Sequence, residues 1–262
     1  MMDWTGIWIP LITPMRHGAP DLDALDALVH DLATQGVAGF VACGSTGEAA
    51  MLEAAEQEAV LAATLRAAAG LPVLMGLSGT QPGVVAARSR QLAEQHPAVA
   101  GWLLAAPAYV RPTQAGIADF FEQVASATDK PLVAYDIPAR TGVRIEARTL
   151  LALADHPRIV AVKDCSGDRA AAQALLADGR LALLAGNDDE LFDQLARGAA
   201  GGITASAQAA PAAFVELQRL LAAQRLHEAR ALWQRLAPLV GALFAEPNPA
   251  PLKGLLARQG RI

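Results

Sequence analysis

Residues 159–168 read IVAVKDCSGD, and they decide the fold. Four apolar residues, three of them β-branched, precede a single lysine, and the polar turn Asp-Cys-Ser-Gly-Asp follows at once. A short apolar run bounded by turn residues is typical of a strand buried on both faces of a parallel sheet. The pattern predicts that Lys163 lies at the carboxyl-terminal end of such a strand, where its amine would attack a carbonyl substrate.

The same rhythm of a short apolar run followed by a helical pattern occurs eight times along the chain. This count favours a (β/α)8 TIM barrel of the α/β class over an open, doubly wound sheet. The expected strands are 7–15, 39–44, 72–79, 101–107, 131–138, 159–164, 181–188 and 202–206. The expected helices are 22–35, 51–69, 82–95, 114–128, 147–155, 169–177, 190–197 and 211–221.

Two more helical patterns, at 225–244 and 250–258, follow the eighth pair and are separated by Glu246-Pro-Asn-Pro. Paired prolines interrupt a helix, and no linker here is long enough for a separate domain. We therefore expect the barrel to span 1–224 and a short C-terminal helical appendage to span 225–262.

The composition narrows the function. The chain of 262 residues is 53% hydrophobic and has a net charge of −5, so it lacks the basic surface that binding to nucleic acid or an anionic membrane requires. No apolar run approaches the ~20 residues of a membrane span, and the N-terminus lacks the basic start of a secretory signal. Two cysteines without metal-ligand spacing disfavour a disulfide framework or a zinc site. A reduced, cytoplasmic protein acting on small molecules is expected.

Lysine is rare in this chain, with three residues against 18 arginines. A lysine after a strand is more often a solvated end or an ion-pair partner than a nucleophile. The run before Lys163, however, should enter the barrel interior, where burial lowers the pKa of an ammonium group and frees the amine. A free amine forms a Schiff base with a ketone, which supports carbon–carbon bond chemistry without a cofactor.

Other polar candidates lie where strands end, because the active site of a barrel sits at that rim. Ser45 and Thr46 in GSTGE would bind a carboxylate and relay protons, or simply cap a turn. Tyr135 would be the relay partner of Thr46, or a core aromatic. Arg140 would bind a carboxylate, or be a surface arginine. Tyr109 could project outward to a neighbouring subunit, and no histidine falls at these strand ends.

Six motifs occur in the order of a known family: GSTGE, AYVRPTQAG, YDIPARTG, VAVKDCSGD, LLAGND and EPNPAPLKG. With them the chain resembles, over nearly its whole length, the dihydrodipicolinate synthase / N-acetylneuraminate lyase family of pyruvate-dependent class I aldolases. The resemblance implies that Lys163 forms the Schiff base with pyruvate and that Tyr135 carries protons. It also implies a pyruvate pocket formed by the backbone near Ile203 and by the Ser45, Thr46 and Gly47 turn.

Within the family, an arginine after the relay tyrosine marks the branch that binds L-aspartate-4-semialdehyde, and Arg140 matches it. The implied reaction condenses pyruvate with this aldehyde to 4-hydroxy-tetrahydrodipicolinate, a step of lysine and diaminopimelate biosynthesis, with no cofactor and no metal. Tyr109 matches a tyrosine that completes the neighbouring subunit's relay, which implies a homotetramer built as a dimer of dimers. The alternatives are an N-acetylneuraminate lyase, a 2-keto-3-deoxy sugar acid aldolase, or a non-catalytic barrel that binds a keto acid.

The chain departs from the family pattern at several positions. Asp136 stands where asparagine is common, Ala139 stands where serine is common, and the chain is about thirty residues shorter than typical members. Val84, Ala54 and Ala108 occupy the approximate positions of the glutamate, histidine and tyrosine that bind feedback lysine in regulated members. None of these three side chains can bind an ammonium or a carboxylate, so insensitivity to L-lysine is expected.

Overall fold

The computed structural model describes residues 2–262. Eight parallel strands close into a barrel in the order β1-β10-β9-β8-β7-β6-β5-β4, which confirms the predicted fold. Gly6 to Trp8 of the first strand pair with Gly201 to Ile203 of the last and so close the ring. The barrel strands are β1 (Gly6–Pro10), β4 (Gly39–Ala42), β5 (Val73–Leu77), β6 (Gly101–Ala105), β7 (Leu132–Asp136), β8 (Ile159–Asp164), β9 (Ala182–Ala185) and β10 (Gly201–Ile203).

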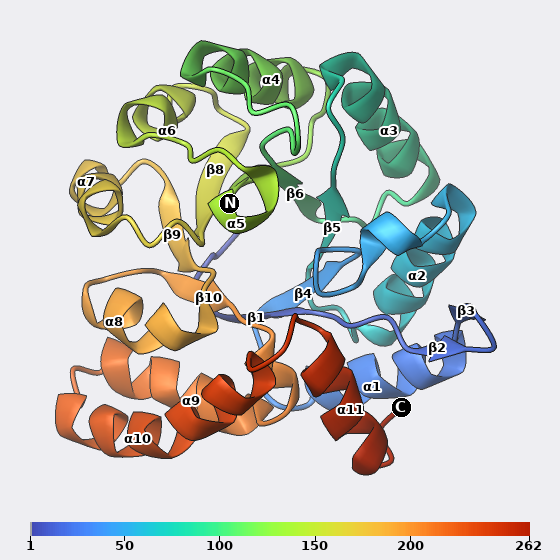
Figure 1. The fold of residues 1–262 in the computed structure, drawn as a ribbon, viewed down its shortest axis with the longest axis vertical. Helices are drawn as coiled ribbons and strands as arrows, with labels where there is room; N and C mark the ends of the chain where they lie inside the picture. Colours follow the sequence, from blue (N-terminus) through green and yellow to red (C-terminus); the bar gives the residue numbers. More distant parts are fainter. Residues whose placement is uncertain (1) are drawn as a thin grey trace.

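The helices form an outer ring around these strands (Figure 1). Helix starts carry the expected chemistry: the carboxylates of Asp21 and Asp168 and the hydroxyl of Thr113 each accept a backbone N–H of the first turn. The ring consists of α1 (Leu22–Ala33), α2 (Ala54–Ala67), α3 (Pro82–Gln95), α4 (Gln114–Ser126), α6 (Ala147–Leu153), α7 (Arg169–Asp178), α8 (Leu191–Ala196) and α9 (Pro211–Ala222).

Several short elements lie between the predicted ones. They comprise a hairpin of β2 (Met15–Arg16) and β3 (Ala19–Pro20), the four-residue helix α5 (Pro138–Thr141), and the 3-10 turns η1 (Ala49–Met51), η2 (Asp188–Glu190) and η3 (Ser206–Gln208). Segments of two to four residues are too short to show a hydrophobic period, so sequence patterning does not reveal them.

The C-terminal segment folds back onto the barrel. Helix α10 (Leu226–Leu243) packs on α9, and α11 (Ala250–Arg258) lies beside α1 and near β4 (Figure 1). An ion pair of 2.6 Å joins Lys253 of α11 to Glu48 in the loop after β4, and a second of 2.6 Å joins Arg261 to Asp31 of α1. The chain's end is thus tied to its first βα units.

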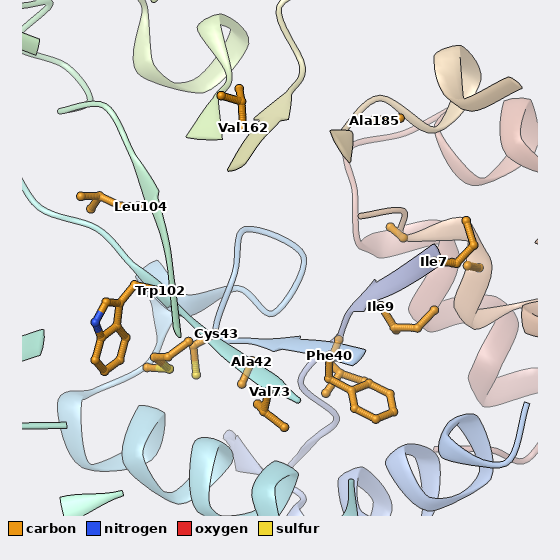
Figure 2. Packing of buried hydrophobic residues seen from close by; sticks show 14 of the residues in the cluster. Ile7, Ile9, Phe40, Ala42, Cys43, Val73, Trp102, Leu104, Val162 and Ala185 are labelled. Atoms are coloured by element: carbon orange, nitrogen blue, oxygen red, sulfur yellow. The ribbon is translucent and has the colours of Figure 1, made fainter. Parts of the chain in front are cut away.

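Two separate cores follow from the alternation of side chains along each strand. Ile7 and Ile9 point outward to the helices, as do Phe40 and Val162, in the larger core (Figure 2). Trp8 lies between Ile7 and Ile9 and points inward, where it stacks on Trp4 at 5.4 Å. Inward-facing residues of the other strands fill the barrel interior around it: Val41, Leu74, Leu103, Val133, Ala161, Leu184 and Ile203.

Candidate active site

Lys163 and Tyr135 share the inner face of the barrel. Each lies two residues beyond an inward-facing residue of its strand, Ala161 in β8 and Val133 in β7. The strands pair Tyr135 with Lys163, and the Lys163 Nζ lies 4.3 Å from the centroid of the tyrosine ring. Both side chains are only 6% exposed. Strand register alone therefore brings a buried amine next to a buried phenol.

Burial controls the charge of this amine. Desolvation lowers the pKa of Lys163 from its usual 10.5, while Cys165 and Asp188 act in the opposite direction. The buried carboxylate of Asp188 is itself held by the backbone N–H groups of Ala205, at 3.2 Å, and Ser206, at 2.6 Å. A β-carbon at Gly186 would come within 3.0 Å of the Lys163 Cγ, so a residue without a side chain is required beside the amine.

The Tyr135 phenol stays protonated. Burial raises its pKa well above 10, Cys165 acts in the same direction, and a hydrogen bond with the Ser45 side chain acts against them. The Cys165 Sγ lies 3.9 Å from the phenol oxygen, and burial raises the pKa of this thiol to about 12. The phenol therefore keeps its proton at neutral pH, and the neighbouring thiol remains uncharged.

The two hydroxyls of the loop after β4 have different partners. The Ser45 side chain lies near Tyr135 and lowers the pKa of its phenol. The Thr46 Oγ1 instead accepts a hydrogen bond of 2.9 Å from the Asn248 Nδ2. Their side chains diverge because consecutive residues of a tight turn point in different directions. The Thr46 hydroxyl is thus bonded to Asn248, and the proton relay expected between Thr46 and Tyr135 stays a prediction.

A cavity of about 630 Å³ opens above the amine. Six of the predicted site residues line this cavity: Ser45, Thr46, Tyr135, Arg140, Lys163 and Ile203. A second cavity of about 410 Å³ adjoins the first and shares Ser45, Tyr135, Ile137, Arg140 and Asn248 with it. The first cavity has room for two small organic acids at once.

Two predicted residues lie apart from this group. Gly47 lines neither cavity; its carbonyl accepts the Thr13 hydroxyl at 2.8 Å, and a β-carbon there would come within 3.0 Å of the Leu11 carbonyl. Gly47 thus allows its loop to pack closely against Leu11 and Thr13 in the loop after β1. Tyr109 is 94% exposed and adopts a positive φ of 70°, so it faces away from its own chain's site.

Sequence reasoning missed three contributors. Asp188 and Cys165 are ordinary turn residues in the sequence and become site residues only through the register of β8 and β9. Asn248 belongs to the EPNP run after α10 and reaches a loop 202 residues earlier in the chain. Its signal was the paired prolines, which predict a sharp turn but not the direction in which that turn points.

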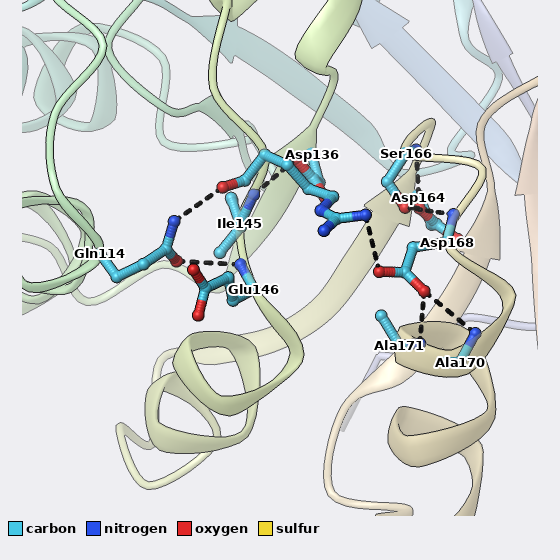
Figure 3. A network of polar contacts seen from close by, with 10 residues as sticks. Gln114, Asp136, Ile145, Glu146, Asp164, Ser166, Asp168, Ala170 and Ala171 are labelled. Carbon is cyan, nitrogen blue, oxygen red and sulfur yellow. Dashed lines mark hydrogen bonds and ion pairs between the residues drawn. The ribbon is translucent and has the colours of Figure 1, made fainter.

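A polar network supports the site from outside the barrel (Figure 3). Asp136 and Asp164 are paired across β7 and β8 and point outward. The Asp136 Oδ1 accepts the Ile145 N–H at 3.1 Å, the Asp164 Oδ1 accepts the Ser166 hydroxyl at 2.6 Å, and Arg144 pairs with Asp168 at 2.9 Å. Burial, with Asp164 nearby, raises the pKa of Asp136 to about 7. Asp136, where the sequence departs from the family pattern, therefore lies behind Tyr135 and outside the cavity.

Two further features of residues 2–262 bear on other kinds of function. No group of three or more His, Cys, Asp or Glu side chains is arranged so that it could hold a metal ion. No helix in that range has both the length and the hydropathy needed to cross a membrane.

The site combines a buried amine of lowered pKa with a phenol at the carboxyl-terminal rim of a (β/α)8 barrel. This arrangement is typical of a class I lyase, an enzyme that forms an imine between its substrate and a lysine. The family model described as "Dihydrodipicolinate synthetase family" matches residues 3–262. The chain belongs to this family.

Its relatives agree with that assignment. The 4-hydroxy-tetrahydrodipicolinate synthase of Stenotrophomonas maltophilia strain R551-3 is 38% identical over 267 residues, covering 99% of this chain and 88% of the relative. The 4-hydroxy-tetrahydrodipicolinate synthase 2 of Clostridium acetobutylicum is 34% identical over 260 residues, covering 98% and 90%.

Solved structures give the same result. The dihydrodipicolinate synthase of Acinetobacter baumannii, described as chloride-inhibited and complexed with pyruvate, superposes with a TM-score of 0.94 at 31% identity, covering 98% of this chain and 89% of that one. The enzyme from Thermotoga maritima gives 0.95 at 28% identity, covering 99% and 90%. The chain is thus a class I lyase of the 4-hydroxy-tetrahydrodipicolinate synthase type.

Proposed function

We propose that the protein condenses pyruvate with L-aspartate-4-semialdehyde to 4-hydroxy-tetrahydrodipicolinate, as a cytoplasmic step of lysine and diaminopimelate biosynthesis. The observation that carries the proposal is the buried Lys163 amine, 4.3 Å from the Tyr135 ring, in a cavity with an arginine at its mouth. The pyruvate complex of the Acinetobacter baumannii enzyme supports pyruvate as the first substrate, and the names of the relatives support a reaction of the synthase type.

The first half of the proposed reaction makes a nucleophile from pyruvate. The neutral Lys163 amine attacks the ketone carbon, water leaves, and an iminium ion forms. This cation acidifies the methyl group of pyruvate, and loss of one methyl proton gives an enamine. Burial favours this half because it lowers the pKa of the amine and so increases the uncharged fraction that can attack.

The proposed route for the protons runs through Tyr135 and Ser45. The phenol lies beside the amine, and the Ser45 hydroxyl is its hydrogen-bond partner. A hydroxyl both donates and accepts, so a pair of hydroxyls can move a proton without either group holding a charge for long. Tyr109 of a second subunit would extend this relay outward through the second cavity, which Ser45 and Tyr135 also line.

The second half joins the two substrates. The enamine carbon attacks the aldehyde, and the amino group of the second substrate then attacks the iminium carbon and displaces Lys163 as the ring closes. Arg140 is exposed at the cavity mouth, where its planar guanidinium suits the carboxylate of the aldehyde in a bidentate contact. The cyclic product leaves with the lysine free for another turnover.

A dimer supplies the missing tyrosine in this proposal. Large apolar side chains are exposed in the segments that follow three neighbouring strands, β4, β5 and β6: Met51 at 81%, Val84 at 59%, Val110 at 56% and Tyr109 at 94%. Exposed apolar groups gathered on one side of a molecule mark an interaction surface. We infer a homodimer through this surface, with two dimers forming a tetramer as in the family resemblance.

Borohydride reduction in the presence of pyruvate tests the chemistry directly. The expected result is a stable adduct of one reduced pyruvate per chain on Lys163, located by peptide mapping. Background labelling should be low because the chain has only two other lysines, and the amines of Lys130 and Lys253 are bonded to the Pro97 carbonyl and to Glu48. An adduct on another residue would overturn the mechanism, and no adduct would favour the non-catalytic barrel.

One observation favours the sugar-acid aldolases as a second candidate. Asp189 and Glu246 also line the cavity, and carboxylates accept hydrogen bonds from sugar hydroxyls. Assays that pair pyruvate with either aldehyde class decide between the two. If the acceptor is L-aspartate-4-semialdehyde, Arg140→Ala should raise its KM at least tenfold and leave the pyruvate KM within about twofold.

A further inference from the structure

The loop that carries Thr46 is held by a residue from the far end of the chain. We propose that Asn248 is a positioning residue, which turns the Thr46 hydroxyl into a hydrogen-bond donor aimed at the carboxylate of the keto acid. This inference rests on the proposed function, because it assigns a task in binding the first substrate. It concerns a residue of the C-terminal segment, outside the strands and loops of the barrel.

The side chains of Thr46 and Asn248 differ in their hydrogen-bonding capacity. A threonine hydroxyl has one proton to donate and lone pairs that accept, whereas an amide nitrogen can only donate. The Asn248 Nδ2 lies 2.9 Å from the Thr46 Oγ1, so it occupies a lone pair of that oxygen. The hydroxyl proton must therefore point away from Asn248.

This proton is available to a ligand. Thr46 is 5% exposed and lines the cavity that holds Lys163. Within residues 2–262 the hydroxyl has no protein acceptor for its proton. Because the proton faces the cavity, a substrate carboxylate bound there can accept it in a charge-assisted hydrogen bond. Ser45 is engaged with Tyr135, so the two neighbouring hydroxyls divide proton transfer and substrate binding between them.

The same asparagine also contacts the second anion-binding group. Its backbone carbonyl accepts a hydrogen bond of 3.4 Å from the Arg140 Nη2. The side chain thus orients the donor for one carboxylate, and the backbone restrains the guanidinium for the other. Substitution of the side chain leaves the carbonyl in place, so the two tasks can be separated by mutation.

A second contact holds the segment that contains Asn248 against the loop after β4. Lys253, five residues beyond Asn248, pairs with Glu48 at 2.6 Å, and Glu48 lies two residues beyond Thr46. Two cross-links between 46–48 and 248–253 hold the segments in register. The orientation of the Thr46 hydroxyl is thus built into the way the C-terminal segment docks.

The decisive comparison replaces Asn248 by aspartate, which has the same shape and the opposite polarity. A carboxylate only accepts, so in Asn248→Asp the Thr46 proton would turn toward residue 248 and be lost to the substrate. Asn248→Ala removes the constraint without reversing it. We expect the pyruvate KM to rise at least tenfold in Asn248→Asp and about threefold in Asn248→Ala.

Thr46→Val separates this effect from the added charge. If Asn248 acts through the Thr46 hydroxyl, its substitution should have almost no effect once that hydroxyl is removed. In the Thr46→Val background, Asn248→Ala should therefore raise the pyruvate KM by less than about 1.5-fold. Asn248→Asp should retain only its charge effect there. Asn187→Asp adds the same charge to the same cavity, but Asn187 bonds to Glu190, so its effect should be equal in both backgrounds.

Equal effects of Asn248→Ala with and without the Thr46 hydroxyl would overturn the inference. Thr46→Ser, which keeps the hydroxyl, should keep the coupling, and it guards against a trivial loss of folding in Thr46→Val. Borohydride trapping at saturating pyruvate distinguishes the two levels of the argument. Adduct formation on Lys163 in every variant, without coupling, refutes only the role of Asn248; absence of the adduct in the unmodified protein refutes the proposed function.

Discussion

At the residue scale, the site depends on which way each side chain points from its strand. Lys163 and Tyr135 could be predicted because alternation along a strand and the count of strands place both at the inner rim. The division of work between Ser45 and Thr46 could not, because a turn has no fixed period. Asn248 could not either, because its contact with Thr46 spans 202 residues and depends on how α10 and α11 pack.

Asp136 gives a prediction on stability and pH. Its pKa rises from 3.8 to about 7 in the folded protein, so the folded state holds the proton more tightly than the unfolded chain. Stability is therefore lost as the pH rises from about 4 to 7, by about 4 kcal/mol in total at about 1.4 kcal/mol per pKa unit. Asparagine cannot ionise, and its Oδ1 can still accept the Ile145 N–H.

Asp136→Asn should accordingly stabilise the protein by a few kcal/mol at pH 8 and by much less at pH 5. Urea unfolding at the two pH values measures the difference. Asp178→Asn is a suitable control, since the exposed Asp178 pairs with Arg180 and its pKa is lowered, so this variant should give no gain at pH 8. Equal stabilisation by Asp136→Asn at both pH values would contradict the assignment of the raised pKa.

At the element scale, hydrophobic periodicity predicted the regular structure closely. The bounds of α3 (Pro82–Gln95), α11 (Ala250–Arg258) and β8 (Ile159–Asp164) agree with the predicted ranges, because prolines or turn residues mark their ends. The predicted strand 7–15 ends earlier, at Pro10, because Leu11 to Pro14 form the loop that packs against Gly47. The four-residue helix α5, which carries Arg140, has no periodic signal.

The link between α11 and the loop after β4 gives a second prediction. The Lys253–Glu48 pair is about one-quarter to one-third exposed, so it contributes at most about 1 kcal/mol to stability. Its effect on Thr46 should be larger than its effect on folding. Lys253→Met should raise the pyruvate KM severalfold and lower the thermal midpoint by only a few degrees.

The reversed pair Glu48→Lys with Lys253→Glu should recover part of the lost affinity. Arg219→Met removes a comparable surface pair with Glu216 on α9, far from the cavity lining, and should leave the pyruvate KM unchanged. If Lys253→Met lowers stability strongly while the pyruvate KM stays constant, the pair is structural and does not support the site.

At the scale of the whole molecule, the proposed dimer predicts that two inactive variants restore each other. In a mixed dimer of Lys163→Ala and Tyr109→Phe subunits, one site has the lysine of its own chain and the tyrosine of its partner. When the two variants are unfolded together and refolded as a mixture, activity should therefore return. Each mixed dimer should have one active site. Rescue would be absent if Tyr109 served its own chain, whose site it does not line.

Regulation by L-lysine gives a prediction at the same scale. Val84 and Ala108 are exposed on the proposed dimer surface, and neither they nor Ala54 offer a charged or hydrogen-bonding side chain. L-Lysine at about 1 mM should leave the initial rate unchanged. The ammonium and carboxylate groups of L-lysine need polar partners, and these three side chains provide none. Inhibition at sub-millimolar lysine would show that other residues form a regulatory site.

The attachment of residues 248–253 to the loop after β4 has a consequence for how the enzyme is made. Synthesis makes β4 and Thr46 first, Lys163 later and Asn248 last of the three. The barrel strands are complete at Ile203, so a closed ring can exist before the segment that orients Thr46 has been synthesised. The nascent chain therefore contains the Lys163 amine before it contains Asn248, the residue that we propose to orient the Thr46 hydroxyl.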